Sequence, residues 1–224
     1  MSEVYAVAID GPSGSGKSTA AKMLAERLNI TYVDTGAMYR AVGLYCLNNG
    51  IPTTDENAVK SALDKINITF KITDGVRRII LNGSDVTDTI RTQQAGMAAS
   101  NVAAIGAVRE KLVDMQRDIA KEMSVVMDGR DIGTVVLKDA AVKLYIDASV
   151  EERTKRRMGE LRAKGIESDF DTVKKEIEER DYNDTHRKLN PLRKADDAVE
   201  IITDGMSAEE VCERALDIIT DKLK

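Results

Sequence analysis

Short apolar runs bounded by turn residues recur along the chain, and each predicts a buried strand. The runs are VYAVAI at 4–9, ITYV at 30–33, SVVM at 124–127, VKLYI at 142–146 and VEII at 199–202. Runs of this kind are typical of parallel strands that are covered on both faces. We therefore predict a parallel sheet of about five strands.

Segments with helical spacing of apolar residues separate these runs. Residues 17–28 carry Ala21, Leu24, Ala25 and Leu28 on one helical face. The same spacing indicates helices at 37–48, 55–65, 92–123, 149–163, 170–188 and 207–222. Strands that alternate with helices predict an α/β fold with helices on both sides of the sheet.

One segment, residues 67–87, breaks this rhythm. NITFKI alternates with period two, TDG predicts a turn, RRIIL follows, and NG predicts a second turn before SDV. This pattern predicts an antiparallel meander that is inserted into the α/β core.

Length and composition add few constraints. The 224 residues suffice for one large domain or for a core with inserted subdomains. No apolar run is long enough to span a bilayer, and the N-terminal stretch has no basic segment before an apolar core, so we expect neither a membrane span nor a secretory signal. Two isolated cysteines, Cys46 and Cys212, are typical of a reducing cytoplasm, which is the expected location.

Charge and motif content exclude several function classes. A net charge of −5 argues against a protein that binds the backbone of nucleic acids. The single histidine, His186, excludes a metal site with several histidines. The chain has no N-K-x-D segment of the kind that reads guanine in GTPases, and it is short for a motor or transport ATPase.

The strongest motif is GPSGSGKS at 11–18, which matches G-x-x-x-x-G-K-[ST]. Its glycines allow backbone N–H groups to turn around phosphate oxygens, while Lys17 can reach the β- and γ-phosphates and Ser18 can ligate Mg²⁺. A flexible Gly/Ser turn is the alternative, but a strand precedes the loop and a helix follows it, which favours an anion site. We assign ATP binding to Gly11, Pro12, Ser13, Gly14, Ser15, Gly16, Lys17, Ser18 and Thr19.

Two arginines lie where their charge requires an explanation. Arg40 lies in the first turns of a helix that begins near Gly36, where a cation opposes the helix dipole by about 0.3–1 kcal/mol. Arg130 follows a buried strand, and ligands of open α/β sheets bind at the carboxyl ends of strands. An exposed arginine without a role is the alternative for Arg40.

Two further sets of charged residues lie on predicted helices. One helical face carries Arg153, Arg156 and Arg157, for which a solvated helix paired with neighbouring glutamates is the alternative. Another carries Arg180, Asp184 and Arg187. A solvated helix is the alternative there as well, but it applies more weakly, because an acid flanked by arginines at this spacing suits a ribose and a phosphate. Separated arginines and a phosphate loop together suggest two phosphorylated substrates that meet head to head.

This combination resembles the bacterial cytidylate kinase family, in the nucleoside monophosphate kinase group. The resemblance covers nearly the whole chain and is carried by VAIDGPSGSGKST at 7–19, DTGAMYR at 34–40, IRTQQ…AAS at 90–100, DGRDIGTVV at 128–136, the arginine-rich helix at 153–157 and ERDYND at 179–184. The meander is similar to the enlarged monophosphate-binding insert of that family. Thr35 stands where relatives often have serine, and both supply a hydroxyl.

The resemblance implies one P-loop kinase domain with three parts. They are a core of 1–34, 106–149 and 166–224, a monophosphate-binding region of 35–105 that contains the insert, and a short helical lid of 150–165. It implies that Arg40 and Arg130 hold the acceptor α-phosphate, with Tyr39 and Thr35 nearby. Ser100, Arg109 and Asp131 would read the base, Arg180 and Asp184 would hold the sugar hydroxyls, and Arg187 would lie beside the same nucleotide.

The implied reaction transfers the γ-phosphoryl group of ATP to CMP or dCMP. Lys17, Arg153 and Arg157 would neutralise charge on the transferred group, and Ser18 and Asp128 would hold Mg²⁺. No general base is required, because the second pKa of the acceptor phosphate is about 6. We expect a monomer that binds neither a nucleic-acid polymer nor a membrane.

Two other functions remain open from the sequence. A P-loop kinase of a small hydroxyl metabolite, such as a shikimate-type acid, would need a base, and Asp34 is the candidate. A nucleotide-binding regulator without catalytic activity is the other alternative.

Overall fold

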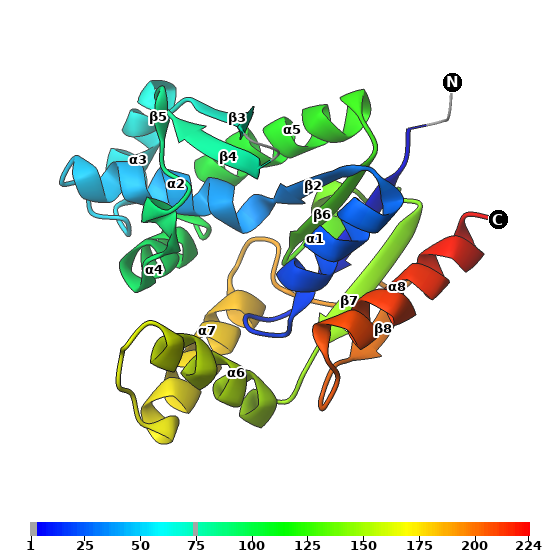
Figure 1. Cartoon of the computed structure of the whole chain (residues 1–224). Helices are drawn as coiled ribbons and strands as arrows, with labels where there is room; N and C mark the ends of the chain where they lie inside the picture. Colours follow the sequence, from blue (N-terminus) through cyan, green and yellow to red (C-terminus); the bar gives the residue numbers. More distant parts are fainter. Residues whose placement is uncertain (1–3, 74–75) are drawn as a thin grey trace. The chain divides into compact units, whose positions relative to one another are not determined.

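The computed structural model describes residues 4–73 and 76–224 (Figure 1). The turn expected at 73–75 falls mainly on residues 74–75, which lie outside the described residues. The chain divides into two compact units: Met1–Val33 with Arg117–Lys224, and Asp34–Gln116. The finer division into core, monophosphate-binding region and lid stays a prediction.

The first unit contains a five-stranded parallel sheet with the order β2-β6-β1-β7-β8, as predicted. Its strands are β1 (Ala6–Asp10), β2 (Thr31–Asp34), β6 (Val125–Gly129), β7 (Val142–Asp147) and β8 (Val199–Ile202). The central strand β1 pairs in parallel with β6 on one side and with β7 on the other. The register sets Asp10 opposite Gly129, so the segments that leave β1 and β6 start side by side.

The first unit also contains helices. They are α1 (Lys17–Leu28), α6 (Val150–Ala163), α7 (Phe170–His186), α8 (Ala208–Lys222) and the last turns of α5 (Gly106–Glu122). The helices α1 and α8 lie side by side along one face of the sheet (Figure 1), where Leu24 and Ile219 pack with Ile9 in a fully buried cluster. Burial of each such side chain contributes about 1.5–3 kcal/mol. The helices α6 and α7 pack on each other through Leu161, Val173 and Ile177.

The second unit combines helices with a small antiparallel sheet. Its elements are α2 (Thr35–Asn48), α3 (Glu56–Ala62), β3 (Ile68–Thr73), β4 (Val76–Leu81), β5 (Ser84–Asp85), α4 (Gln93–Val102) and the first turns of α5. The strands form a sheet with the order β3-β4-β5, which confirms the predicted meander. A close approach joins α2 to α4, because a Cβ at Gly43 would lie 2.8 Å from the Cβ of Ala98.

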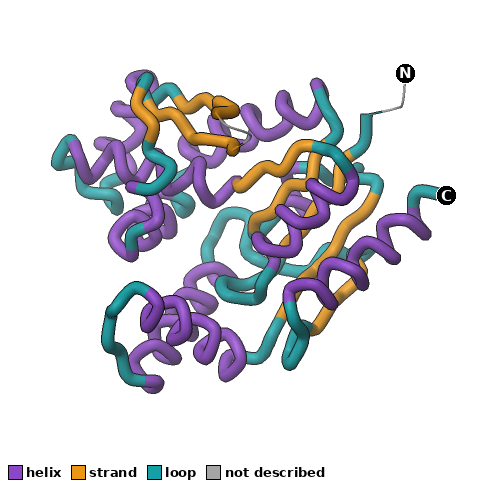
Figure 2. Tube along the Cα trace, in the orientation of Figure 1, coloured by secondary structure: helices purple, strands orange, loops and turns teal. Residues whose placement is uncertain are grey.

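Two features differ from the sequence prediction, and both concern helical segments (Figure 2). The stretch 92–123 is helical as expected, but the chain turns at 103–105 and divides it into α4 and α5. The turn is closed by Ala104 and Ile105, whose N–H groups donate to the carbonyls of Asn101 and Val102. A short π-helix, η3 (Ile132–Val136), follows β6 where no element was predicted.

Both cysteines are buried and free. In the part of the chain that the structure describes, no helix combines the length and the apolar character needed to cross a bilayer.

Candidate functional site

The phosphate loop joins β1 to α1 through three glycines with positive φ. Gly11, Gly14 and Gly16 have φ values of 151°, 77° and 88°, which residues with a side chain rarely adopt. A Cβ at Gly11 would in addition collide with the carbonyl oxygen of Ile146. The loop therefore requires glycine at this position for two independent reasons.

Lys17 closes the loop from inside. Its ammonium group is buried and donates to the carbonyl oxygen of Pro12 at 2.9 Å. Burial, with a smaller contribution from the nearby charge of Arg130, lowers the pKa of Lys17 to about 7, while Asp128 opposes the shift. A triphosphate at this loop would favour the charged form, because phosphate oxygens would replace the lost hydration.

Ser18 and Asp128 form a pair of oxygen donors beside the loop. The Ser18 hydroxyl donates to Oδ2 of Asp128 at 2.6 Å, and the Tyr32 hydroxyl donates to Oδ1 of the same carboxylate at 2.9 Å. Asp128 is buried in β6, one residue before its end. A hydroxyl next to a carboxylate fits Mg²⁺, which takes oxygen ligands and is held by few protein groups together with substrate phosphates and water.

The segment that follows β6 forms two ion pairs, one with Asp184 in α7 and one with Arg187, the residue that follows this helix. Nε of Arg130 donates to Oδ2 of Asp184 at 2.7 Å, and the two side chains are only 17% and 10% exposed. Next to it, Arg187 contacts Oδ1 of Asp131 at 3.2 Å. Burial opposes the charge of Asp184, but the cations of Arg130, Arg180 and Arg187 outweigh it and hold the pKa of this carboxyl below its usual range.

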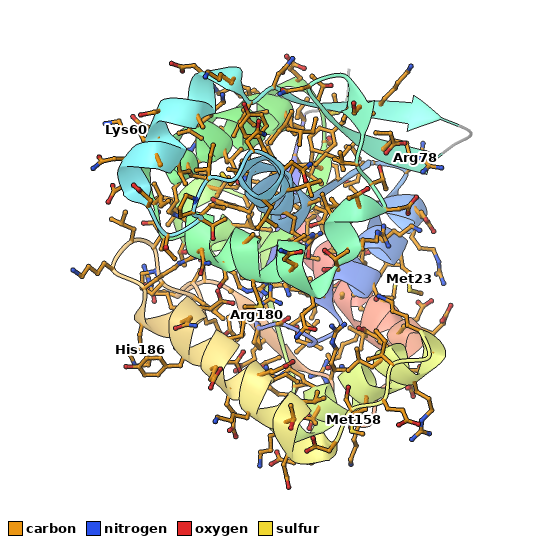
Figure 3. The ribbon with its side chains drawn as sticks, turned by 90° about the vertical axis from the view of Figure 1, so that its left-hand side faces the viewer. Met23, Lys60, Arg78, Met158, Arg180 and His186 are labelled. Atoms are coloured by element: carbon orange, nitrogen blue, oxygen red, sulfur yellow. The ribbon has the colours of Figure 1, made fainter. Side chains whose placement is uncertain are left out.

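The predicted residues of α7 are thus brought together with those of the 128–131 segment. Arg180 lies one turn before Asp184 on the same helix and is labelled in Figure 3. His186 projects outward at the end of α7 in the same view, and it is exposed. The only histidine therefore lies on the solvent side of its helix, whereas the charged set at 180–187 includes the buried Asp184.

The arginines of α6 have different partners. Arg153 is 4% exposed and contacts Asp181 at 2.6 Å, and it also donates to the carbonyl of Ser13 in the phosphate loop at 3.2 Å. Arg156 donates to Glu152 and to both oxygens of Thr203. Arg157 pairs with Glu160 within the helix, as in the solvated-helix alternative. Of this set, Arg153 and Arg156 lie at the phosphate loop, since a Cβ at Gly16 would be 3.4 Å from Nη1 of Arg156.

Asp34 organises the start of α2 in the second unit. Its carboxylate accepts the N–H of Ala37 as the helix cap, and it pairs with Arg40 at 2.8 Å. The Arg40 cation is therefore tolerated in the first turns because the cap carboxylate offsets the helix dipole. Thr35, which follows the cap, is buried.

Two of the residues expected near the base, Ser100 and Arg109, lie on other helices of the same unit, whereas Asp131 belongs to the first unit. The guanidinium of the buried Arg109 lies over the Tyr39 ring, 5.7 Å from its centroid, and donates to the carbonyl of Ala103. Ser100 is half-buried on α4. The second unit thus brings Tyr39 and Arg109 into contact, and Arg40 into contact with Asp34.

Several residues of the first unit were missed by sequence reasoning. Asp10 ends β1 and binds the backbone after Asp131, and Arg117 in α5 binds the same turn. Thr203 donates to the carbonyl of Ser15 in the phosphate loop and accepts from Arg156. For Asp10 a signal existed, since a carboxylate directly before a phosphate loop repels the ligand unless another group neutralises or binds it.

Comparisons with known proteins indicate the family of the chain. The family model described as cytidylate kinase matches residues 7–221. The chain is 48% identical over 219 residues to the cytidylate kinase of Leuconostoc mesenteroides subsp. mesenteroides, with 98% of each chain covered. It is 49% identical over 213 residues to that of Clostridium botulinum, with 95% of this chain and 96% of the relative covered.

Solved structures show the same fold at low identity. An uncharacterised protein from Eubacterium ventriosum has a TM-score of 0.53 at 15% identity, with 96% of this chain and 98% of that chain covered. A gluconokinase from Sinorhizobium meliloti has a TM-score of 0.50 at 13% identity, with 97% and 93% covered. These two likenesses concern the fold alone. The family model and the full-length relatives show more: the chain belongs to the cytidylate kinase family.

Proposed function

We propose that the protein is a CMP kinase that transfers the γ-phosphoryl group of ATP to CMP and dCMP, giving ADP with CDP or dCDP. The observation that carries this proposal is the arrangement at the ends of β1 and β6. The phosphate loop follows β1, and Arg130 and Asp131 follow β6, the neighbour of β1 in the sheet. Arg130 is paired with Asp184, and Asp131 with Arg187. A triphosphate site and a second site rich in arginine and carboxylate thus lie in one unit.

The phosphate loop is the proposed ATP site. Its backbone N–H groups and the N-terminus of α1 favour phosphate oxygens, and Lys17 can exchange the Pro12 carbonyl for them. Ser18 and Asp128 would hold Mg²⁺, which supplies neutralisation of phosphate charge. The ATP-binding set remains the one predicted from the sequence, residues 11–19.

CMP is proposed to bind the charged residues of the 130–131 segment and of 180–187. Arg130 would hold the α-phosphate, Asp131 would accept from the cytosine amine, and Asp184 would hold the sugar hydroxyls, with Arg180 and Arg187 beside them. Uracil offers a carbonyl where cytosine offers the amine. That carbonyl oxygen would face the Asp131 carboxylate, two acceptors without a proton between them, which favours cytosine.

Residues of the second unit are proposed for CMP as well. Arg40 is assigned to the phosphate, and Ser100 and Arg109 to the base, with Thr35 and Tyr39 adjacent. The contact of Arg109 with the Tyr39 ring supports a defined orientation of its guanidinium. An arginine that lies over an aromatic ring has less conformational freedom to lose when the nucleotide binds.

Catalysis in this proposal depends on positioning and on charge. The acceptor phosphate has a second pKa of about 6, so it is largely deprotonated at neutral pH and needs no base. Lys17 and Arg153 already lie at the phosphate loop. Arg157 would leave Glu160, which costs at most about 1 kcal/mol for so exposed a pair. The lid of 150–165 would exclude water from the reacting groups.

The kinase of a small hydroxyl metabolite is less well supported. That reaction needs Asp34 as a base, whereas Asp34 accepts the Ala37 N–H and pairs with Arg40. Both carboxylate oxygens of Asp34 are therefore already engaged, Oδ1 with Ala37 and Oδ2 with Arg40. We propose further that the enzyme is a cytoplasmic monomer that acts on small molecules only.

A substrate panel tests the proposal. ADP release is measured with ATP, Mg²⁺ and, in turn, CMP, dCMP, UMP, AMP and shikimate. We expect turnover with CMP and dCMP and far less with the other three. Turnover with shikimate and none with CMP would overturn the proposal, and ATP binding without turnover on any acceptor would favour the regulator.

A further inference from the structure

The π-helix η3 is held at both of its ends by charged side chains from elsewhere in the first unit. At its start, the two carboxylate oxygens of Asp10 accept the N–H groups of Ile132 and Gly133 at 2.7 and 2.8 Å. At its end, Arg117 donates to the carbonyls of Val135 and Val136 at 2.9 and 3.1 Å. Each charge meets the backbone groups that a short helix leaves unpaired at that end.

The turn depends on these two partners. A π-helix of five residues has few internal hydrogen bonds, and such turns are rare and often lie at functional sites. Asp10 is 3% exposed, and burial raises its pKa to about 6. Its charged form is therefore less favourable here than in water.

The held turn begins directly after the residues proposed for CMP. Asp131 flanks η3 at its start, and the N–H groups of Val135 and Val136 donate to the carbonyl of Asp131 at 2.9 and 3.2 Å. The direction of the Arg130 and Asp131 side chains therefore depends on how η3 is fixed. Asp10 also directly precedes Gly11, the first residue of the phosphate loop.

We propose that Asp10 and Arg117 are positioning residues for the acceptor nucleotide, which fix η3 and thereby aim Arg130 and Asp131 at CMP. The inference rests on the proposed function. The proposal assigns neither residue a contact with a substrate. Both act through the backbone of residues 131–136. A displacement of about 1 Å at a substrate-binding group is enough to cost a large factor in rate.

The test compares the Michaelis constants for the two substrates. Arg117→Met removes both donors and keeps an apolar stem, and we expect it to raise KM for CMP about tenfold, the scale of one or two lost hydrogen bonds. KM for ATP should change less than about twofold, because the phosphate loop keeps Lys17 and its glycines. Arg117→Lys, which restores one donor, should recover part of the CMP affinity. Lys121→Met, an exposed position on the same helix, is the control.

Asp10→Asn serves as the second variant, with a readout that needs no catalysis. We expect the amides of Ile132 and Gly133 to exchange with deuterium at least about tenfold faster in this variant than in the wild type, because they lose their acceptor. The amides of α8 should exchange at the wild-type rate. If Arg117→Met fails to fold, this measurement can still show whether Asp10 holds η3.

The possible results separate the two proposals. Equal increases of both Michaelis constants in Arg117→Met, or no change in either, would overturn the positioning role. Unchanged amide exchange at Ile132 and Gly133 in Asp10→Asn would show that Asp10 does not hold the start of η3. Absence of CMP turnover in the wild type would refute the proposed function, and the exchange data would then still decide whether Asp10 holds η3.

Discussion

Arg130 and Asp184 form a hydrogen-bonded ion pair at 2.7 Å that joins the end of β6 to α7. Both side chains are largely buried, and each is the strongest charge partner of the other. A nucleotide that binds here meets a guanidinium and a carboxylate whose positions are set before it arrives, which reduces the loss of side-chain entropy on binding.

Removal of one partner should therefore destabilise the fold. Asp184→Ala leaves Nε of Arg130 without its carboxylate acceptor, and we expect the free energy of unfolding to fall by about 1–3 kcal/mol. Urea denaturation measures the change. Glu160→Ala, which breaks the exposed pair with Arg157, is the matched control and should change stability by less than about 1 kcal/mol. Similar losses in both variants would show that burial of the Arg130 pair has no energetic weight.

Asp131→Ala should damage the use of CMP far more than the binding of ATP. The variant removes the proposed acceptor for the cytosine amine, and we expect kcat/KM for CMP to fall about a hundredfold, or about 2.7 kcal/mol. Calorimetry with ATP should give a dissociation constant close to that of the wild type. Equal losses for CMP and ATP would contradict the role in base recognition.

Gly11→Ala should abolish the phosphate loop as a binding site. The new Cβ would collide with the Ile146 carbonyl, and the residue would have to keep a φ of 151°. We expect a loss of at least about 2 kcal/mol in stability together with a loss of ATP binding.

Gly159→Ala is the control for that substitution. Gly159 lies in α6 with nothing within 4 Å of its added Cβ, so alanine should stabilise the helix by about 0.5–1 kcal/mol. Thermal unfolding of both variants, with and without ATP, makes the comparison. Retained ATP binding in Gly11→Ala would be incompatible with the described loop.

The pH dependence of stability should show the buried carboxyl of Asp10. Its pKa is raised to about 6, chiefly by burial, whereas in the unfolded chain it returns to about 3.8. Between these values the native state holds the proton and the unfolded state does not. This group therefore reduces stability as pH rises from about 4 to 6, and it has no further effect above that range.

Asp10→Asn removes this dependence. The variant loses hydrogen bonds at every pH, but its stability relative to the wild type should improve from pH 4 to 6 and then stay level. Urea denaturation at pH 4, 5, 6 and 7 gives the difference. A difference that is constant over this range would mean that Asp10 ionises with an ordinary pKa.

Local patterns were sufficient for most of the fold. The helix α1 has the predicted bounds, because the phosphate loop fixes its start and Asn29, in the left-handed conformation, ends it. The five core strands were found because each is a short apolar run next to turn residues. The break at 103–105 was not found, since apolar residues keep their helical spacing on both sides of it.

Contacts between distant segments were beyond the sequence. Spacing placed Arg180 and Asp184 on one face of a helix, but it did not show that Asp184 meets Arg130, 54 residues earlier. Nor did it show η3, whose start is fixed by Asp10 at a separation of 122 residues. Of the lid arginines, spacing did not distinguish Arg153, which contacts the phosphate loop, from Arg157, which pairs with Glu160.

The parallel pairing of β1 with β6 fixes the distance between the starting points of the two loops that follow these strands. Asp10 lies opposite Gly129, so the phosphate loop and the Arg130 segment start one strand spacing apart, about 4.8 Å. Backbone hydrogen bonds set this length, and no side chain contributes to it. Substitutions can therefore change how strongly each loop binds, whereas only an insertion or deletion within β1 or β6 can change how far apart the loops begin.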